Sequence, residues 1–234
     1  MSTILFSGSW RQTEDMGAAA IKSPLGTVRL DARINGDLLS ANRPSTFVSN
    51  ADARLFVWNT PALLAELMVC RPHLDLPSGM NVTDCHAAVW RIRAEKRPVT
   101  EYALTCRLEA PAGQQPGSPC SGQGLEAQEW SDGKINMTIG TQDAWAMVMY
   151  RNNGGILPDR WVQDLSGNRS EEVNLVEYAN DGFILRPPGL QPGEIAQIQF
   201  VVAWAFEPRG EIANWYAVDL PPANIISTLP DAGN

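Results

Sequence analysis

The chain has 234 residues, and its 26 acidic and 18 basic side chains give a formal net charge of −8. This balance argues against a nucleic-acid partner, because nucleic-acid backbones are bound by clustered Lys and Arg. Hydrophobic residues make up 44% of the chain, which suits a globular core, and no apolar run approaches the roughly 20 residues of a transmembrane segment. The first ten residues lack a basic region and a long apolar stretch, so we expect no signal peptide and a chain that is cytoplasmic as synthesised. Export by another route stays open.

In chain order, the first strong signals are a strand and a helix. Residues 27–34 alternate apolar and polar side chains, as a half-buried strand does. Residues 60–70 predict a helix, because Thr60 suits the N-cap, Pro61 suits the first helical position and Pro72 ends the segment. A weaker helical turn is expected within residues 14–22.

Two pairs of segments carry the pattern of a β-hairpin: residues 89–98 with 101–111, and residues 200–210 with 211–221. Each pair has an apolar run of period two, a short charged turn with proline, and a second run that ends at proline. A further similarity relates residues 52–58 to residues 143–149. These similarities support the hypothesis of an internal duplication, with two generic β domains of similar pattern as the alternative.

The composition changes most at residues 110–124, where Pro, Gly, Ser and Gln crowd together without periodicity. Such a segment is typical of a linker or a long exposed loop. It divides the chain into two β-rich lobes, residues 1–109 and 125–234, and the second lobe would duplicate the first. Further strands are expected at residues 134–139, 175–178 and 182–186. The fold class is therefore mostly β, an antiparallel β-sandwich or barrel-like architecture with one or two short helices and two similar lobes.

The chain has only two histidines, His73 and His86, and four widely spaced cysteines, which we expect to be free and mostly buried thiols. Cys70 and Cys85 lie near these histidines and have metal-ligand chemistry. Neighbouring residues on an extended chain point to opposite faces, however, so Cys85 and His86 do not suit one zinc ion. A histidine that activates a cysteine would need a contact that spacing does not reveal. We therefore predict no metal site and no cofactor.

Residues 164–172 begin like a calcium loop, with Asp164, Ser166 and Asn168 at alternate positions. The glycine comes at the fourth position instead of the sixth, and no glutamate follows at the twelfth, so the segment is not an EF-hand. The offset between the similar segments grows from 91 residues (52–58 and 143–149) to 111 residues (89–98 and 200–210), so the second lobe has 20 extra residues between them. Residues 164–172 lie in that region and remain a candidate for ligand binding. Long insertions on a rigid β scaffold often carry function.

The eight tryptophans are the most distinctive feature of the composition. Four of them lie in apolar strand patterns and are expected in the core: Trp58, Trp90, Trp145 and Trp204. Three others lie among polar or turn residues. An exposed indole beside Asp or Asn can cover the apolar face of a sugar while the polar groups bind its hydroxyls. The predicted ligand-binding residues are Trp130, Asp132, Trp161, Asp164, Asn168, Asn214 and Trp215.

These features predict a non-enzymatic binding protein that recognises a glycan or a similar polar surface, with a glycan or a protein as partner and a homo-oligomer as an open option. One alternative is a cofactor-independent isomerase, cyclase or lyase whose carboxylates, tyrosines or lysines transfer protons in a pocket of the β scaffold. Another is a self-assembling structural protein or a membrane-acting, toxin-like protein, for which long uncovered edge strands would be the sign.

Overall fold

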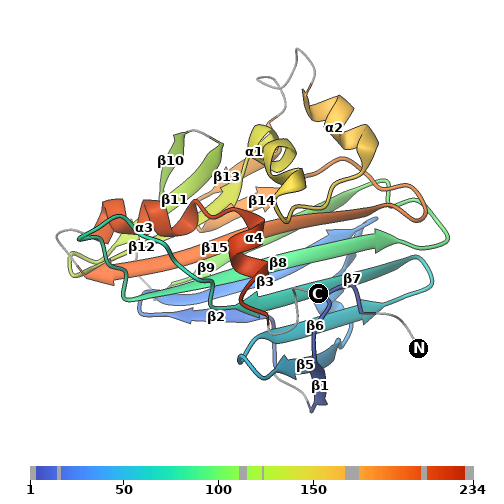
Figure 1. The fold of residues 1–234 in the computed structure, drawn as a ribbon, viewed down its shortest axis with the longest axis horizontal. Helices are drawn as coiled ribbons and strands as arrows, with labels where there is room; N and C mark the ends of the chain where they lie inside the picture. The colour runs from blue at the N-terminus through green and yellow to red at the C-terminus, as the bar shows by residue number, and fades with distance from the viewer. Residues whose placement is uncertain are drawn as a thin grey trace.

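The computed structural model describes residues 4–14, 17–110, 115–122, 124–166, 174–206 and 210–229. These residues form two antiparallel β-sheets that face each other, with four short α-helices around them (Figure 1). Both sheets are open at their edges, so the prediction of a mostly β, antiparallel sandwich is confirmed. Within the described ranges, no helix has the length and apolar character needed to cross a membrane.

The larger sheet, sheet A, contains nine described strands in the order β1 (Trp10–Thr13), β5 (Ser45–Ser49), β6 (Arg54–Asn59), β7 (Leu63–Cys70), β8 (Asp84–Ala94), β15 (Ile195–Phe206), β12 (Ile135–Gln142), β11 (Leu125–Ser131) and β10 (Ser118–Gly122). The smaller sheet, sheet B, has the order β13 (Val176–Ala179), β14 (Gly182–Leu185), β9 (Tyr102–Glu109), β3 (Gly26–Ile34) and β2 (Ala20–Ser23), and β4 (Asp37–Leu38) also pairs with β3. The helices are α1 (Ala144–Met149), α2 (Asp159–Ser166), α3 (Gly210–Val218) and α4 (Pro222–Ile226), with 3₁₀ turns η1 (Leu39–Ala41) and η2 (Tyr150–Asn152).

The central strands of sheet A, β7, β8 and β15, are buried on both faces. On β8, Trp90 enters the core between the sheets, whereas Val89 points to the opposite face, because side chains alternate along a strand. That opposite face is covered by the N-terminal segment 4–10 and by α3 and α4, which Figure 1 shows in front of the sheet. Most side chains of these strands are therefore apolar, as in strands covered on both sides, and the buried polar exceptions are Glu66, Arg91, Gln197 and Gln199.

The helix expected at residues 60–70 is wrong, because residues 63–70 form β7 and all eight of its side chains are buried. The hydroxyl of Thr60 does accept hydrogen bonds from the N–H groups of Ala62 and Leu63, at 3.3 and 3.1 Å, but in the turn that joins β6 to β7. Burial on both faces of a central strand outweighs the helix propensity of these residues. The weaker helical turn expected at residues 14–22 is also wrong in its second part, where residues 20–23 form β2.

The two predicted hairpins are wrong as well. β8 pairs with β7 and β15 in sheet A, whereas β9 pairs with β3 and β14 in sheet B. After β15 the chain forms α3 instead of a second strand. The similar segments at residues 52–58 and 143–149 likewise differ, since the first contains β6 and the second contains α1. The strands expected at residues 27–34, 134–139, 175–178 and 182–186 are present as β3, β12, β13 and β14.

Both sheets combine strands from the two lobes expected from the sequence. β8 pairs with β15 along most of its length, and β9 pairs with β14. Within the expected linker, Ser118–Gly122 form β10 at the edge of sheet A. The division of the chain at residues 110–124 stays a prediction.

Sheet B covers only part of the inner face of sheet A. At one end of the sandwich, α1 and α2 complete the core with Met147, Trp161 and Leu165. At one edge, sheet B ends with β2, a strand of four residues that pairs with only part of β3. Two cavities open near this free edge.

Candidate functional site

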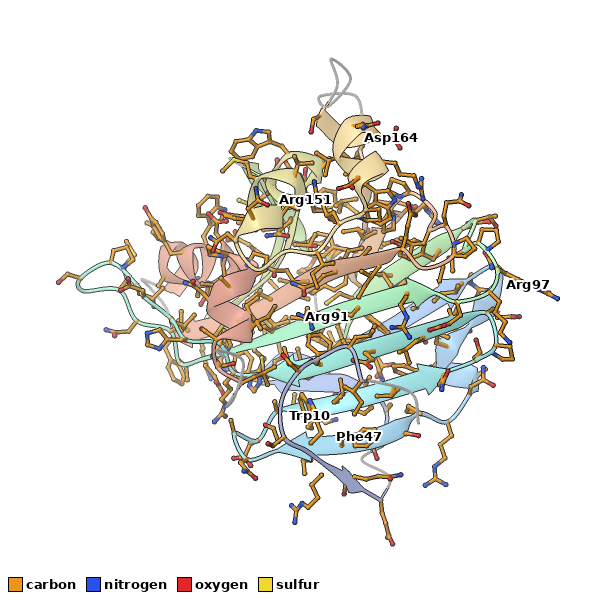
Figure 2. All side chains as sticks on the ribbon, turned by 45° about the vertical axis from the view of Figure 1, so that its right-hand side comes forward. Trp10, Phe47, Arg91, Arg97, Arg151 and Asp164 are labelled. Carbon is orange, nitrogen blue, oxygen red and sulfur yellow. The ribbon has the colours of Figure 1, made fainter. Side chains whose placement is uncertain are left out.

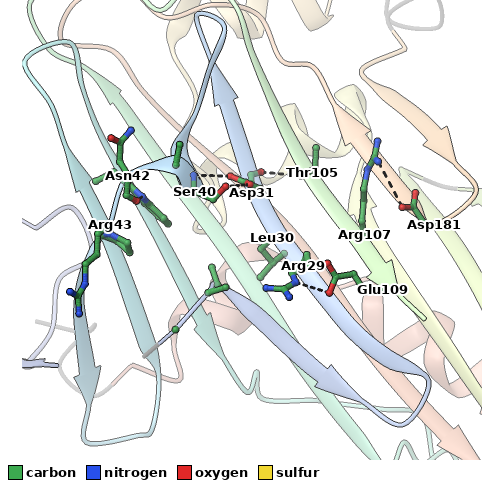
Figure 3. A pocket seen from close by; sticks show the side chains of 16 residues that line it. Arg29, Leu30, Asp31, Ser40, Asn42, Arg43, Thr105, Arg107, Glu109 and Asp181 are labelled. Atoms are coloured by element: carbon green, nitrogen blue, oxygen red, sulfur yellow. Dashed lines mark hydrogen bonds and ion pairs between the residues drawn. The ribbon is translucent and has the colours of Figure 1, made fainter. Parts of the chain in front are cut away.

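The larger cavity has a volume of about 830 Å³ and lies between β3, β9 and residues 40–44 (Figure 3). Its size is within the range of pockets that hold small ligands. Alternation along the strands builds one wall, because Arg29 and Asp31 of β3 and Arg107 of β9 point away from the core. The buried side chain of Trp58 lines the cavity from β6.

The charges of this cavity balance. Its described lining contains three basic and three acidic side chains, Arg29, Arg43, Arg107, Asp31, Glu109 and Asp181. Arg29 donates to Glu109 at 2.8 Å, and Arg107 lies 3.8 Å from Asp181. These four side chains are between 40% and 58% exposed, so solvent weakens both ion pairs and a ligand can replace either partner.

The wall formed by residues 40–44 is fixed from two sides. Asp31 accepts hydrogen bonds from the N–H and the hydroxyl of Ser40, at 3.2 and 2.5 Å. The indole Nε1 of Trp58 donates to the carbonyl of Asn42 at 3.0 Å. Because the bond from Trp58 uses the backbone carbonyl of Asn42, the exposed side-chain amide of Asn42 is available at the cavity wall (Figure 3).

A second cavity of about 460 Å³ adjoins the first, and both are lined by Ala18 and Arg29. It follows the edge of β2, with Lys22 and Arg29 contributed by sheet B and Arg54 and His86 contributed by sheet A. The ring of His86 stacks on Trp204 with centroids 5.5 Å apart. Burial lowers the pKa of His86, so this imidazole is neutral at pH 7.

A third feature is an exposed aromatic patch beside the turn from β10 to β11. Trp145 is 51% exposed and Tyr216 is 44% exposed. A Cβ atom on Gly124 would lie 2.9 Å from the ring of Trp145, and one on Gly122 would lie 3.9 Å from the ring of Trp215, so the two indoles flank this turn. The expectation that Trp145 belongs to the core is wrong, because α1 turns its neighbours Ala144 and Met147 inward instead.

Two of the tryptophans predicted to bind a ligand are in the core. Trp130 is 4% exposed and Trp161 is fully buried, so the expectation that their rings face solvent is wrong. The indole of Trp161 stacks on Tyr102, with centroids 6.3 Å apart, and donates to the carbonyl of Gly189 at 2.9 Å. On α2, Trp161 shares its face with Leu165, four residues later, which explains why the polar neighbours did not bring it to the surface.

The other predicted site residues are dispersed. Asp132 is exposed in the turn between β11 and β12, where the N–H groups of Ile135 and Lys134 lower its pKa through hydrogen bonds of 2.9 Å. Asp164 is exposed on α2 (Figure 2), and Asn168 lies outside the described residues.

On α3, Asn214 is buried and donates to the carbonyl of Asn136 at 2.8 Å. Its neighbour Trp215 is half-buried and meets Tyr216 edge-on, with centroids 6.0 Å apart. The structure therefore does not gather the described members of the predicted set into one site, and none of them lines either cavity.

The cysteines and His86, whose side chains could bind a metal ion, do not form a metal site in the described part of the chain. Cys85 packs in the outer core of sheet A, whereas His86 points to the opposite face of β8, as alternation predicts. The described part of the chain contains no group of three His, Cys, Asp or Glu side chains arranged for a metal ion. Cys70, Cys85 and Cys106 are buried free thiols and Cys120 is half-buried, which confirms the expectation for the cysteines.

Sequence analysis did not identify the cavity residues Arg29, Asp31, Asn42 and Arg107. The alternation of Arg29 and Asp31 with apolar residues predicts that they lie on a strand. It does not indicate that residues 40–44 form the opposite wall of a cavity. Comparison with family models and with curated proteins finds no match for the chain. The function is therefore argued from the geometry of the cavities.

Proposed function

We propose that the protein binds a neutral, polyhydroxylated ligand such as a saccharide in the 830 Å³ cavity. The observation that carries this proposal is the lining itself, which combines a balanced set of charges with amide, hydroxyl and indole groups. A formal charge of zero favours a neutral ligand over a strongly charged one. The proposal is binding without catalysis.

The chemistry of the lining suits hydroxyl groups, each of which donates and accepts hydrogen bonds. Asp31 offers acceptor oxygens, Arg107 offers donors, and the amide of Asn42 offers both. Hydrogen bonds to the charged groups are the stronger ones. Trp58 and Pro44 add apolar surface against which the C–H face of a sugar ring can lie.

The cavity is also preorganised. Residues 40–44 are held to β3 through Asp31 and to β6 through Trp58, so a ligand does not have to order this loop. Binding then costs less conformational entropy than it would with a free loop.

The proposal is tested by calorimetric titration with a panel of neutral mono- and oligosaccharides. Asn42→Ala is expected to weaken binding by about 0.5–1.5 kcal/mol, and Arg107→Gln by about 1.5–3 kcal/mol, as for neutral and charged hydrogen bonds. Asn50→Ala removes an exposed amide outside the cavity lining and is the matched control. The proposal fails when none of the sugars binds, or when all three variants bind like the wild type.

A second candidate function is self-association through the exposed aromatic patch. Trp145 and Met149 lie one helical turn apart on α1, and Ile212 and Tyr216 lie one turn apart on α3, with exposures between 44% and 62%. Aromatic residues and Met are enriched at protein interfaces. Sedimentation velocity over a range of concentrations tests this function, since Trp145→Ala should weaken any dimer. A monomer at every concentration rejects it.

A further inference from the structure

The 460 Å³ cavity along β2 concentrates positive charge in an acidic protein. Its described lining contains four permanent cations and one carboxylate, namely Lys22, Arg29, Arg54, Arg71 and Asp84. Because His86 is neutral at pH 7, the formal charge of this lining is +3, whereas the chain carries −8. Positive charges that lie close together in a cavity repel one another, and a bound anion relieves this repulsion.

The one carboxylate of the cavity is already shared. Oδ2 of Asp84 lies 2.9 Å from Nη2 of Arg71 and 3.2 Å from Nε2 of His86. Arg29 pairs with Glu109, which is part of the other cavity. Asp84 is therefore not available to neutralise the two remaining cations.

Those two cations, Arg54 and Lys22, donate to uncharged groups. Arg54 donates from Nη2 to the carbonyl of Ala20 at 2.8 Å, and Lys22 donates to the hydroxyl of Thr27 at 2.9 Å. Within the described part of the chain, neither cation has a carboxylate within ion-pair distance. Arg54 is partly buried, and burial lowers its pKa because no opposite charge compensates it.

The cations that line this cavity come from both sheets. Lys22 belongs to β2 of sheet B, whereas Arg54 begins β6 and Arg71 follows β7 in sheet A. An anion along the edge of β2 can thus receive donors from two sides. The planar guanidinium suits sulfate and phosphate oxygens because it can donate two parallel hydrogen bonds.

We propose that this cavity is an oxyanion site that binds a sulfate or phosphate group, with Arg54 and Lys22 as its principal ligands and Arg71 at its rim. The volume exceeds that of a single inorganic ion, so the group can belong to a larger molecule. The site requires no saccharide in the neighbouring cavity and is independent of the function proposed above.

The test is a calorimetric titration of the full chain with sodium sulfate and with inorganic phosphate at low ionic strength. Both anions are expected to bind, more weakly as sodium chloride is added. Arg54→Gln and Lys22→Gln should each weaken binding about tenfold, as expected for the loss of one charge-assisted hydrogen bond. Arg97→Gln removes the same charge from an exposed position outside the cavity and should change nothing (Figure 2).

Folding of each variant is checked by circular dichroism and thermal unfolding. If Arg54→Gln does not fold, the anion affinities of Lys22→Gln and Arg71→Gln test the proposal instead. These two variants should fold, because Lys22 is exposed and the side chain of Arg71 is 72% exposed. The proposal is overturned when neither anion binds, or when the cavity variants bind as tightly as Arg97→Gln.

A second arm identifies the source of the anion. A hexose phosphate is compared with its unphosphorylated hexose and with inorganic phosphate. Tighter binding of the hexose phosphate than of phosphate assigns the site to the acidic group of a larger ligand, and equal binding assigns it to the free ion. Binding of the hexose phosphate that Arg54→Gln and Lys22→Gln leave unchanged would contradict an oxyanion site.

Discussion

Replacement of Glu66 by Gln should destabilise the protein by about 2 kcal/mol at pH 7, because Glu66 anchors the N-terminal segment on the outer face of sheet A. Its side chain is fully buried, with Oε1 accepting from the N–H of Leu5 at 2.7 Å and Oε2 accepting from the N–H of Phe6 at 3.0 Å. Gln has only one acceptor oxygen, so one backbone donor loses its partner and faces an NH₂ group. A buried donor without a partner costs about 1–3 kcal/mol.

The neighbouring cation adds to this cost. Arg91 pairs with Glu66 across the β7–β8 register and is 7% exposed. Its guanidinium lies 4.0 Å from the ring centroid of Phe6 and donates to the carbonyl of Leu5 at 2.7 Å. Glu66→Gln leaves this cation without a nearby negative charge. Glu66 and Arg91 interact through their charges without a direct ion pair, so this loss is smaller than the roughly 3–5 kcal/mol for removal of one partner of a buried ion pair, and the desolvation of Glu66 itself reduces it further.

Urea unfolding followed by tryptophan fluorescence measures the effect, with Glu101→Gln as the control. Glu101 is exposed, so its substitution should change the free energy of unfolding by less than about 0.5 kcal/mol. Hydrogen exchange should show faster exchange at the amides of Leu5 and Phe6 in Glu66→Gln. A loss below about 1 kcal/mol, or unchanged protection of these amides, would refute the reasoning.

The pH dependence has a definite sign. Burial raises the pKa of Glu66 above its ordinary 4.5, although the two backbone hydrogen bonds and Arg91 act in the opposite direction. The folded protein therefore binds this proton more tightly than the unfolded chain. The neutral carboxyl keeps two oxygens that can accept from the N–H groups of Leu5 and Phe6, which the NH₂ group of Gln cannot do. Relative to Glu66→Gln, the wild type should be most stable below pH 4.5 and should lose stability as the pH rises through the pKa of the folded state.

Three further predictions concern other parts of the molecule. Sulfate affinity should rise as the pH falls below 6.5, because protonation of His86 adds a positive charge to the oxyanion cavity. A sulfate affinity that does not change with pH, in the wild type as in His86→Gln, would contradict this. The groups that face His86 are Asp84, Arg71, Arg54 and the ring of Trp204. A thiol reagent should modify one cysteine per native chain, Cys120, because the other three are buried and burial raises their pKa; modification of two or more would argue against this packing. Asp143→Ala should cost about 1 kcal/mol in thermal unfolding, since its carboxylate caps α1 by accepting from the N–H of Ala146 at 2.8 Å, and an unchanged Tm would refute the cap.

The class of the fold could be predicted because the strands carry a local signal. Residues 27–34 alternate along β3, and the buried positions are those with apolar side chains. Partner choice could not be predicted in the same way. β8 and β9 are separated by a short turn and both have period two, yet they belong to different sheets, because period two specifies a buried face and not a neighbour.

Tertiary burial also explains the errors at single residues. β7 has good helix formers, but its place between β6 and β8 in sheet A buries all eight of its side chains, seven of them apolar, on the two faces of the sheet. Trp161 has Asp159 and Arg160 before it, yet its helical spacing to Leu165 places it in the core. The cavity residues could not be predicted, because Asp31, Asn42 and Arg107 meet only when β3, the loop after β4 and β9 are assembled.

Both cavities follow from the unequal sizes of the two sheets. The inner face of β6 has to be covered, but β2 is short and ends sheet B beside it. Arg54 and Trp58 share this inner face of β6, one near each end of the strand, and residues 18–20 lie near the boundary between the cavities that they line. A longer β2 would extend sheet B over these side chains and leave less room for either cavity. A neutral and a cationic cavity can thus lie side by side because β6 supplies one side chain to each, while the charges around them come from different neighbours.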